Sequence, residues 1–225
     1  MFGVRLFLAN CCFFALAVAP AQADPLPECP NTFDSPPRSN AECQIQSGDL
    51  LGLRFEKRTV DARHVEVFVF DHSSTAAVVL DEKIDGSPDS GVLLLRDLDG
   101  DGLEDVLVSL HDTGAHGLNS DWALWRATGD QRLFQRSGTI YGNTFWYAGD
   151  GWTAAYASGG GWGVSFYQLE DGQLSPVAEV GRSNGDSNTP PTSCHLLTFH
   201  DLARHGLTAA TAEQKFCALA EQQPR

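Results

Sequence analysis

Apolar side chains recur at every second position in several short stretches, the spacing typical of half-buried β-strands. Between His64 and Phe70, the residues Val65, Val67 and Val69 alternate with other residues, and the stretch is dense in β-branched and aromatic side chains. A similar unit of strand, short Gly- or Asp-containing turn and second strand recurs within residues 51–80, 122–136 and 164–180. These repeated units predict a series of β-hairpins.

Hairpins that follow one another along the chain favour antiparallel sheets over a parallel α/β sheet. We therefore predict an all-β fold of antiparallel hairpins, arranged as a small irregular propeller-like or sandwich domain. Only the tail breaks the pattern, because residues 199–205 and 211–221 have helical spacing. One face of the second segment gathers small and apolar side chains, namely Ala212, Phe216, Leu219 and Ala220. The sequence thus predicts a short helical tail after the β-rich region.

The first residues have the pattern of an export signal. Arg5 precedes an apolar run from Leu6 to Val18, and Ala21-Gln22-Ala23 supplies the small side chains of a cleavage site. The run is well short of the roughly 20 residues that span a bilayer. We expect residues 1–23 to be removed and the protein to be periplasmic or secreted. The remainder is predicted to comprise an arm (24–50), a β-rich domain (51–185) and a tail (186–225).

Four cysteines remain after the signal: Cys29, Cys43, Cys194 and Cys217. An even number in an exported chain predicts two disulfides, for which three pairings exist. Pairing each cysteine with its near neighbour in sequence, Cys29 with Cys43 and Cys194 with Cys217, is favoured because it would clip the arm and the tail. Zinc on these cysteines is disfavoured, because none of them stands in a C-x-x-C pair.

The formal net charge of −14 becomes −15 without the signal, which contains one Arg and no acid. Such a field repels phosphate backbones and anionic membrane surfaces. Cations and basic proteins are the partners that this charge favours.

The segment Asp97–Asp105 has the spacing of a calcium loop, with acids at positions one, three, five and nine and a glycine at position six. Calcium binds six to eight oxygens, and acids gathered in one tight loop would repel each other without a cation. The predicted ligands are the carboxylates of Asp97, Asp99 and Asp101, the carbonyl of Leu103, and Asp105 directly or through water. Position twelve is Val108 instead of the bidentate Glu of an EF-hand, and the flanking residues 92–95 and 106–110 are predicted strands.

This loop between strands resembles those of integrin-like propeller repeats. Over residues 92–180, the order of strands and loops around it also resembles a family of periplasmic calcium-binding proteins, some of which are immunity proteins. The resemblance implies binding and inhibition of lysozyme-like effectors delivered by type IV secretion systems. It would place the inhibitory surface on the loop from His111 to Asp121, with these residues meeting the partner: His111, Gly114, His116, Asn119 and Trp122.

No enzyme motif is recognisable in the sequence. The histidines do not form H-E-x-x-H, and there is no G-x-S-x-G elbow. We therefore expect a non-enzymatic protein that binds Ca²⁺ and a protein partner. Two alternatives remain open: a secreted hydrolase of glycans and a calcium-dependent structural module of the envelope. The aromatic stretch from Trp146 to Trp162 fits either a glycan groove or the core of a sheet.

Overall fold

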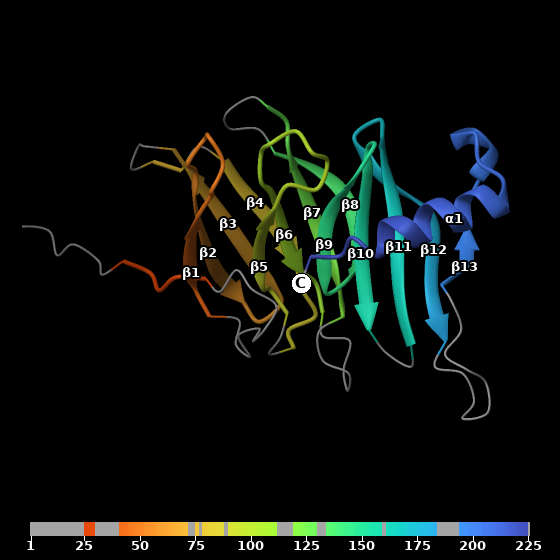
Figure 1. Ribbon diagram of the computed structural model, residues 1–225. Coiled ribbons are helices and arrows are strands. Elements are labelled where there is room, and N and C mark those ends of the chain that lie inside the picture. Colours follow the sequence, from red (N-terminus) through yellow and green to blue (C-terminus); the bar gives the residue numbers. More distant parts are fainter. Residues whose placement is uncertain are drawn as a thin grey trace, which may run out of the picture.

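The computed structural model describes residues 25–29, 41–71, 75–76, 78–87, 90–111, 119–129, 134–158, 161–183 and 194–224 (Figure 1). The predicted all-β class is confirmed: the described chain forms three antiparallel sheets and a short C-terminal helix. The predicted export signal, residues 1–23, lies outside the described residues. Of the helices in the described part, none is long and apolar enough to cross a membrane.

Each sheet is a meander of strands that are consecutive in sequence. The first sheet contains β1 (Cys43–Gln46), β2 (Arg54–Asp61), β3 (His64–Phe70) and β4 (Val78–Lys83). The middle sheet contains β5 (Leu93–Arg96), β6 (Asp105–Ser109), β7 (Ser120–Ala127) and β8 (Phe134–Gly142). The third sheet contains β9 (Thr144–Gly149), β10 (Trp152–Ser158), β11 (Gly161–Glu170), β12 (Gln173–Ser183) and β13 (His195–Phe199). The first and middle sheets have four strands each, the number in a typical propeller blade, whereas the third sheet has five.

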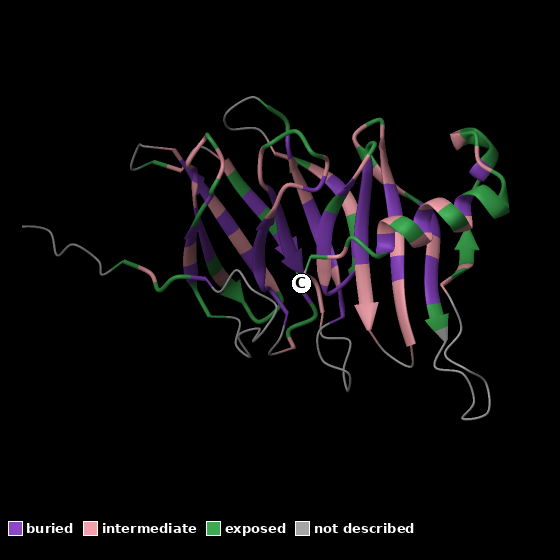
Figure 2. Ribbon diagram, viewed as in Figure 1, coloured by how far each residue is buried: buried purple, intermediate pink, exposed green. Residues whose placement is uncertain are grey.

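The sheets form successive layers (Figure 1), and much of the middle sheet is coloured as buried (Figure 2). Clusters of buried apolar side chains lie between the sheets. Inward residues of the first sheet, such as Phe55 and Val67, pack against Leu95 and Val108 of the middle sheet. The opposite face of the middle sheet packs against the third sheet. The middle sheet is thus covered on both sides.

This position explains the sequence of the middle sheet. Successive side chains of a strand point to opposite faces. In β6, Val106 and Val108 belong to the core on one side and Leu107 to the core on the other, and all three are 0% exposed. The centre of β6 is therefore apolar at successive positions, whereas β3 of the outer sheet alternates between buried and less buried residues from His64 to Val69.

The tail covers the far face of the third sheet. The helix α1 (Ala209–Ala220) is capped by Thr208 and buries Ala212, Phe216 and Ala220 against that face. The predicted second helix is confirmed within two residues at each end. The predicted helical spacing over 199–205 is wrong over its first three residues, because Phe199 ends strand β13 and only Leu202–His205 form a 3-10 helix, η1.

The two disulfides pair as predicted, Cys29 with Cys43 and Cys194 with Cys217. The first bridge joins the segment around Cys29 to strand β1, so the region predicted as an arm supplies an edge strand of the first sheet. The second bridge joins α1 to the residue preceding β13.

Candidate metal centre

The predicted calcium loop connects two neighbouring antiparallel strands. β5 ends at Arg96 and β6 begins at Asp105, and these two residues are paired in the register of the middle sheet. The eight residues between them must therefore reverse the chain within one hairpin connection. This confines the acidic side chains of the loop to a small volume at one edge of the molecule.

Within the loop, carboxylates accept hydrogen bonds from backbone N–H groups that follow them. Asp97 accepts from Gly100 at 2.7 Å and from Gly102 at 3.0 Å. Asp101 accepts from Leu103 at 2.8 Å. Asp99 accepts from Asp101 at 3.2 Å. These bonds wind the loop tightly around its own side chains.

The winding brings three of the predicted ligands together. Asp97, Asp99 and Asp101 each offer a carboxylate oxygen, and these oxygens all lie within 4.8 Å of one another. Oxygens of this kind are the ligands that a hard cation such as Ca²⁺ takes. Burial is the largest cause that raises the pKa of Asp101, and the charges of Asp99 and Asp97 raise it further. A bound cation would remove this mutual repulsion.

Asp105 does not belong to the group of carboxylates whose oxygens lie within 4.8 Å of one another. Its side chain is buried, 1% exposed, and its two oxygens accept backbone hydrogen bonds from Leu98 at 3.1 Å and Ala127 at 2.9 Å. Burial, with a smaller contribution from the charges of Asp99 and Asp101, raises the pKa of Asp105 to about 8. The structure thus gives Asp105 the role of tying the loop to the end of β7, which the sequence did not indicate.

Glycine is required at the turn next to Tyr147. Gly100 has φ +78°, and a Cβ atom there would lie 2.4 Å from the Tyr147 ring of strand β9. The loop therefore packs directly against the third sheet. Gly102 has φ +85°, and a Cβ there would meet no atom within 4 Å.

A second loop, between β1 and β2, contacts the loop from Asp97 to Glu104 through hydrogen bonds. Asp49 accepts from the backbone N–H of Glu104 at 2.9 Å, and the Glu104 carboxylate accepts from the N–H of Gly48 at 2.7 Å. Asp49 also accepts from Leu51 at 2.9 Å, which fixes its own carboxylate. Because these partners are about 55 positions apart in the chain, nothing in the local sequence pattern announced the contact.

An arginine lies beside the convergent carboxylates. Arg126 of β7 places Nη1 3.3 Å from Asp99 Oδ2, with both side chains largely shielded from solvent. Arg126 Nε is buried and has no hydrogen-bond partner in the described part of the chain. Without an ion, this guanidinium supplies positive charge to the loop.

The residues predicted to contact a partner differ in their surroundings. Gly114 and His116 lie outside the described residues. His111 and Asp121 form a pair with 2.6 Å between Nε2 and Oδ2. Asn119 is 9% exposed and accepts from the Asn143 side chain at 3.0 Å.

The structure corrects the expectation for Trp122. Its ring is 4% exposed, lies edge-on to Phe145, and donates its Nε1 hydrogen to the carbonyl of Gly142 at 3.0 Å. The reason is the register of β7, which turns Trp122 toward the third sheet. Trp122 therefore supports the core between two sheets and does not present its ring to a partner.

The aromatic stretch is mainly core. Trp146 and Trp152 are 7% and 4% exposed and belong to the apolar layer between the third sheet and α1. Tyr156 and Trp162 pack against the same layer. These rings hold the tail helix to the sheet.

No protein-family model matches the sequence, and no curated protein matches it. Among solved structures, the chain is similar to one described as "Structure of a Xanthomonas Type IV Secretion System related protein", with 12% sequence identity and a TM-score of 0.39. That alignment covers 69% of this chain and 89% of the other.

Proposed function

We propose that this chain is an exported, non-enzymatic calcium-binding protein that binds a protein partner and inhibits a peptidoglycan hydrolase. The observation that carries the proposal is the convergence of Asp97, Asp99 and Asp101 within one hairpin loop. Three carboxylates, with a carbonyl such as that of Leu103 and water, make up the oxygen set that Ca²⁺ requires.

The contacts of the loop give the ion a structural role in this proposal. The loop contacts the β1–β2 loop through Asp49 and the third sheet through Tyr147. An ion that fixes the loop therefore braces contacts among all three sheets. Binding to the folded state alone raises stability in proportion to the logarithm of ligand concentration.

Two features support a protein partner. The net charge of −14 favours encounter with a basic protein. Two residues of the predicted partner surface are already held by side-chain contacts, His111 by Asp121 and Asn119 by Asn143. Side chains that are fixed before binding lose less conformational freedom when a partner binds.

Calorimetric titration of Ca²⁺ into chelator-treated, disulfide-intact protein tests the metal site. We expect saturable binding and a higher melting temperature, both lost in an Asp99→Ala and Asp101→Ala double variant. A matched control is Asp61→Ala with Glu221→Ala, which removes two exposed acids that belong to neither group of potential metal ligands. If calcium binding produces the same heat in both double variants, calcium binds elsewhere and the proposal for this loop is wrong.

Inhibition is tested separately, with a lysozyme-like hydrolase acting on purified peptidoglycan. The calcium-loaded protein is expected to slow hydrolysis at a stoichiometric ratio, and Gly114→Arg with His116→Glu is expected to abolish the effect without changing calcium binding. If hydrolysis proceeds unchanged while calcium binds, the protein is a calcium-dependent structural module.

A further inference from the structure

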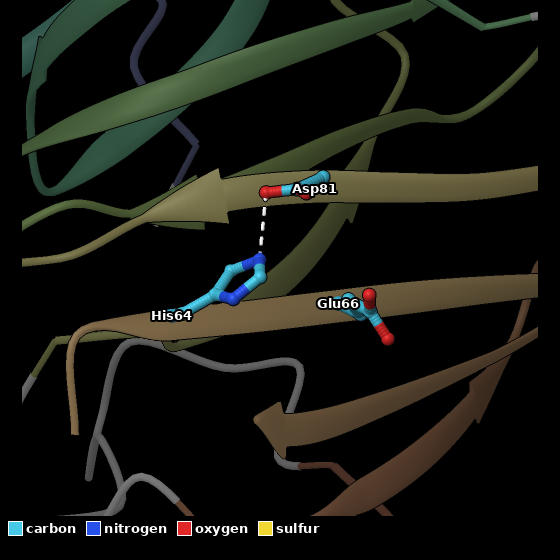
Figure 3. A group of neighbouring side chains, drawn as sticks. All are labelled: His64, Glu66 and Asp81. Carbon is cyan, nitrogen blue, oxygen red and sulfur yellow. Dashed lines mark hydrogen bonds and ion pairs between the residues drawn. The ribbon is translucent and has the colours of Figure 1, made fainter. Parts of the chain in front are cut away.

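A second cluster of metal-binding side chains lies on the outer face of the first sheet, away from the calcium loop. His64 and Glu66 of β3 and Asp81 of β4 each offer one ligand atom, and these atoms lie within 4.8 Å of one another (Figure 3). No local sequence pattern singles out these residues, because they meet only through the pairing of two strands.

The strand pattern fixes the direction of these side chains. Val65 and Val67, which alternate with them on β3, are 0% and 1% exposed and face the middle sheet. Leu80, next to Asp81 on β4, faces the same core. Since neighbouring residues of a strand point to opposite faces, His64, Glu66 and Asp81 must point outward.

The register of β3 and β4 brings two negative charges close together in this cluster. Glu66 and Asp81 are paired directly across the two strands, and like charges in that position destabilise a sheet. His64 contacts one of these carboxylates, with its Nε2 2.8 Å from Asp81 Oδ1. Figure 3 shows the imidazole reaching from β3 toward Asp81 on the neighbouring strand. The arrangement calls for positive charge between the two carboxylates.

Two basic residues face the cluster. Arg58 is paired with Glu66 across β2 and β3, but its guanidinium binds Glu56 at 2.8 Å. Lys83 is paired with His64 across β3 and β4. Both basic residues would compete with a bound cation for the carboxylates. A cation site here would therefore be open to solvent and of moderate affinity.

We propose that His64, Glu66 and Asp81 form a binding site for a divalent transition-metal ion of the zinc type. One imidazole nitrogen with two carboxylate oxygens suits such an ion, whereas the all-oxygen loop at Asp97 suits calcium. Three protein ligands leave a fourth position for water or for a side chain of another molecule. The two sites would therefore select different metals on one chain.

Tetrahedral coordination of an ion at this cluster would require only small movements of the three side chains. Ligand bonds of about 2.0–2.2 Å in a tetrahedron place ligand atoms roughly 3.3–3.6 Å apart. The His64 Nε2 to Asp81 Oδ1 pair has to open from 2.8 Å, and the widest pair has to close from at most 4.8 Å. Because a carboxylate only accepts, the hydrogen in the pair belongs to His64 Nε2. A bound metal ion would replace this hydrogen on Nε2. In a neutral ring the hydrogen would move to Nδ1. In a charged ring, where Nδ1 already carries a hydrogen, the one on Nε2 would be released to solvent.

Zinc titration of the tag-free, disulfide-intact protein tests the site, with the calcium loop first saturated with Ca²⁺. We expect one saturable Zn²⁺ site, a rise in melting temperature, and a zinc-dependent shift of the His64 ring nitrogen signals in NMR spectra. His64→Asn and Asp81→Asn should each weaken binding at least about tenfold, because loss of a ligand should cost no less than loss of a residue that hydrogen-bonds to a ligand, which costs about 10–100-fold.

His111→Asn is the matched control. His111 forms a similar pair with Asp121, but among the described residues it belongs to no group of three potential metal ligands. This variant should bind Zn²⁺ as the unaltered protein does. Zinc binding that survives in His64→Asn, or that is lost in His111→Asn, would overturn the assignment. No saturable binding at millimolar Zn²⁺ would overturn it as well, whatever the outcome at the calcium loop.

Discussion

Arg126 of β7 and Asp99 of the loop between β5 and β6 form an ion pair, with 3.3 Å between Nη1 and Oδ2. The pair places a fixed guanidinium at the edge of the candidate calcium loop. It neutralises part of the loop's charge in the ion-free protein, and a calcium ion bound to Asp99 would feel its repulsion. The arginine thus stabilises the empty loop and opposes the filled one.

The first prediction follows from this opposition. Arg126→Gln should strengthen calcium binding about fivefold, which corresponds to about 1 kcal/mol, because a nearby positive charge is removed. The same variant should melt at a lower temperature when calcium is chelated, because Asp99 loses its partner. Calorimetry and thermal unfolding measure both effects. Arg58→Gln, on the first sheet, should leave calcium affinity unchanged, and equal gains in the two variants would mean a general charge effect.

The second prediction concerns the turn beneath Tyr147. Gly102→Ala should cost about 1–2 kcal/mol, because its φ of +85° is unfavourable for a residue with a Cβ atom. Gly100→Ala should cost a further ~1–3 kcal/mol, because its Cβ would lie 2.4 Å from the Tyr147 ring. Urea unfolding of the calcium-saturated proteins measures the difference.

Combining Gly100→Ala with Tyr147→Ser provides the control for this contact. The smaller side chain should make the added methyl group tolerable, so that the double variant loses less than the sum of the single losses. Additive losses would show that the ring can move aside and that it does not hold the turn.

Features that depend on neighbours in the sequence could be predicted, and features that depend on strand pairing could not. The Asp97–Asp101 carboxylates converge because the loop is short, and the alternation from His64 to Phe70 sets one face of β3. By contrast, the N–H that Asp105 binds belongs to Ala127, 22 positions away. The direction of Trp122 and the meeting of His64 with Asp81 also depend on registers that no local pattern records.

The third prediction concerns the apolar contact that holds the tail helix. Phe216 is 0% exposed, stacks on Phe166 with 4.7 Å between ring centroids and lies edge-on to Trp152. Phe216→Ala should lower the free energy of unfolding by about 3–5 kcal/mol, through lost burial and the cavity left behind. Urea unfolding with intact disulfides measures it. Gln214→Ala, on the exposed side of α1, should change stability little, and a similar loss in both variants would mean that the helix itself, not the Phe216 contact, was disturbed.

The fourth prediction concerns a lysine inside the first sheet. Lys57 of β2 is 2% exposed, and its Nζ donates to the Gly91 carbonyl at 2.8 Å. Burial, partly opposed by Glu42, lowers the pKa of Lys57 to about 8. The unfolded chain has a lysine pKa of about 10.4, so between these values it binds more protons than the folded protein. The contribution of Lys57 to stability must therefore rise as pH increases from about 8 to about 10.4.

The rise should total about 3 kcal/mol, since each pKa unit corresponds to about 1.4 kcal/mol. Lys57→Met removes the titrating group, so the stability of the unaltered protein relative to this variant should increase across that pH range. Chemical unfolding at successive pH values measures the difference, in which effects of other titrating groups cancel. Lys83→Met removes an exposed lysine from the opposite face of the same sheet and serves as the control. Parallel stability curves for the unaltered protein and Lys57→Met would show that Lys57 keeps its ordinary pKa in the folded state.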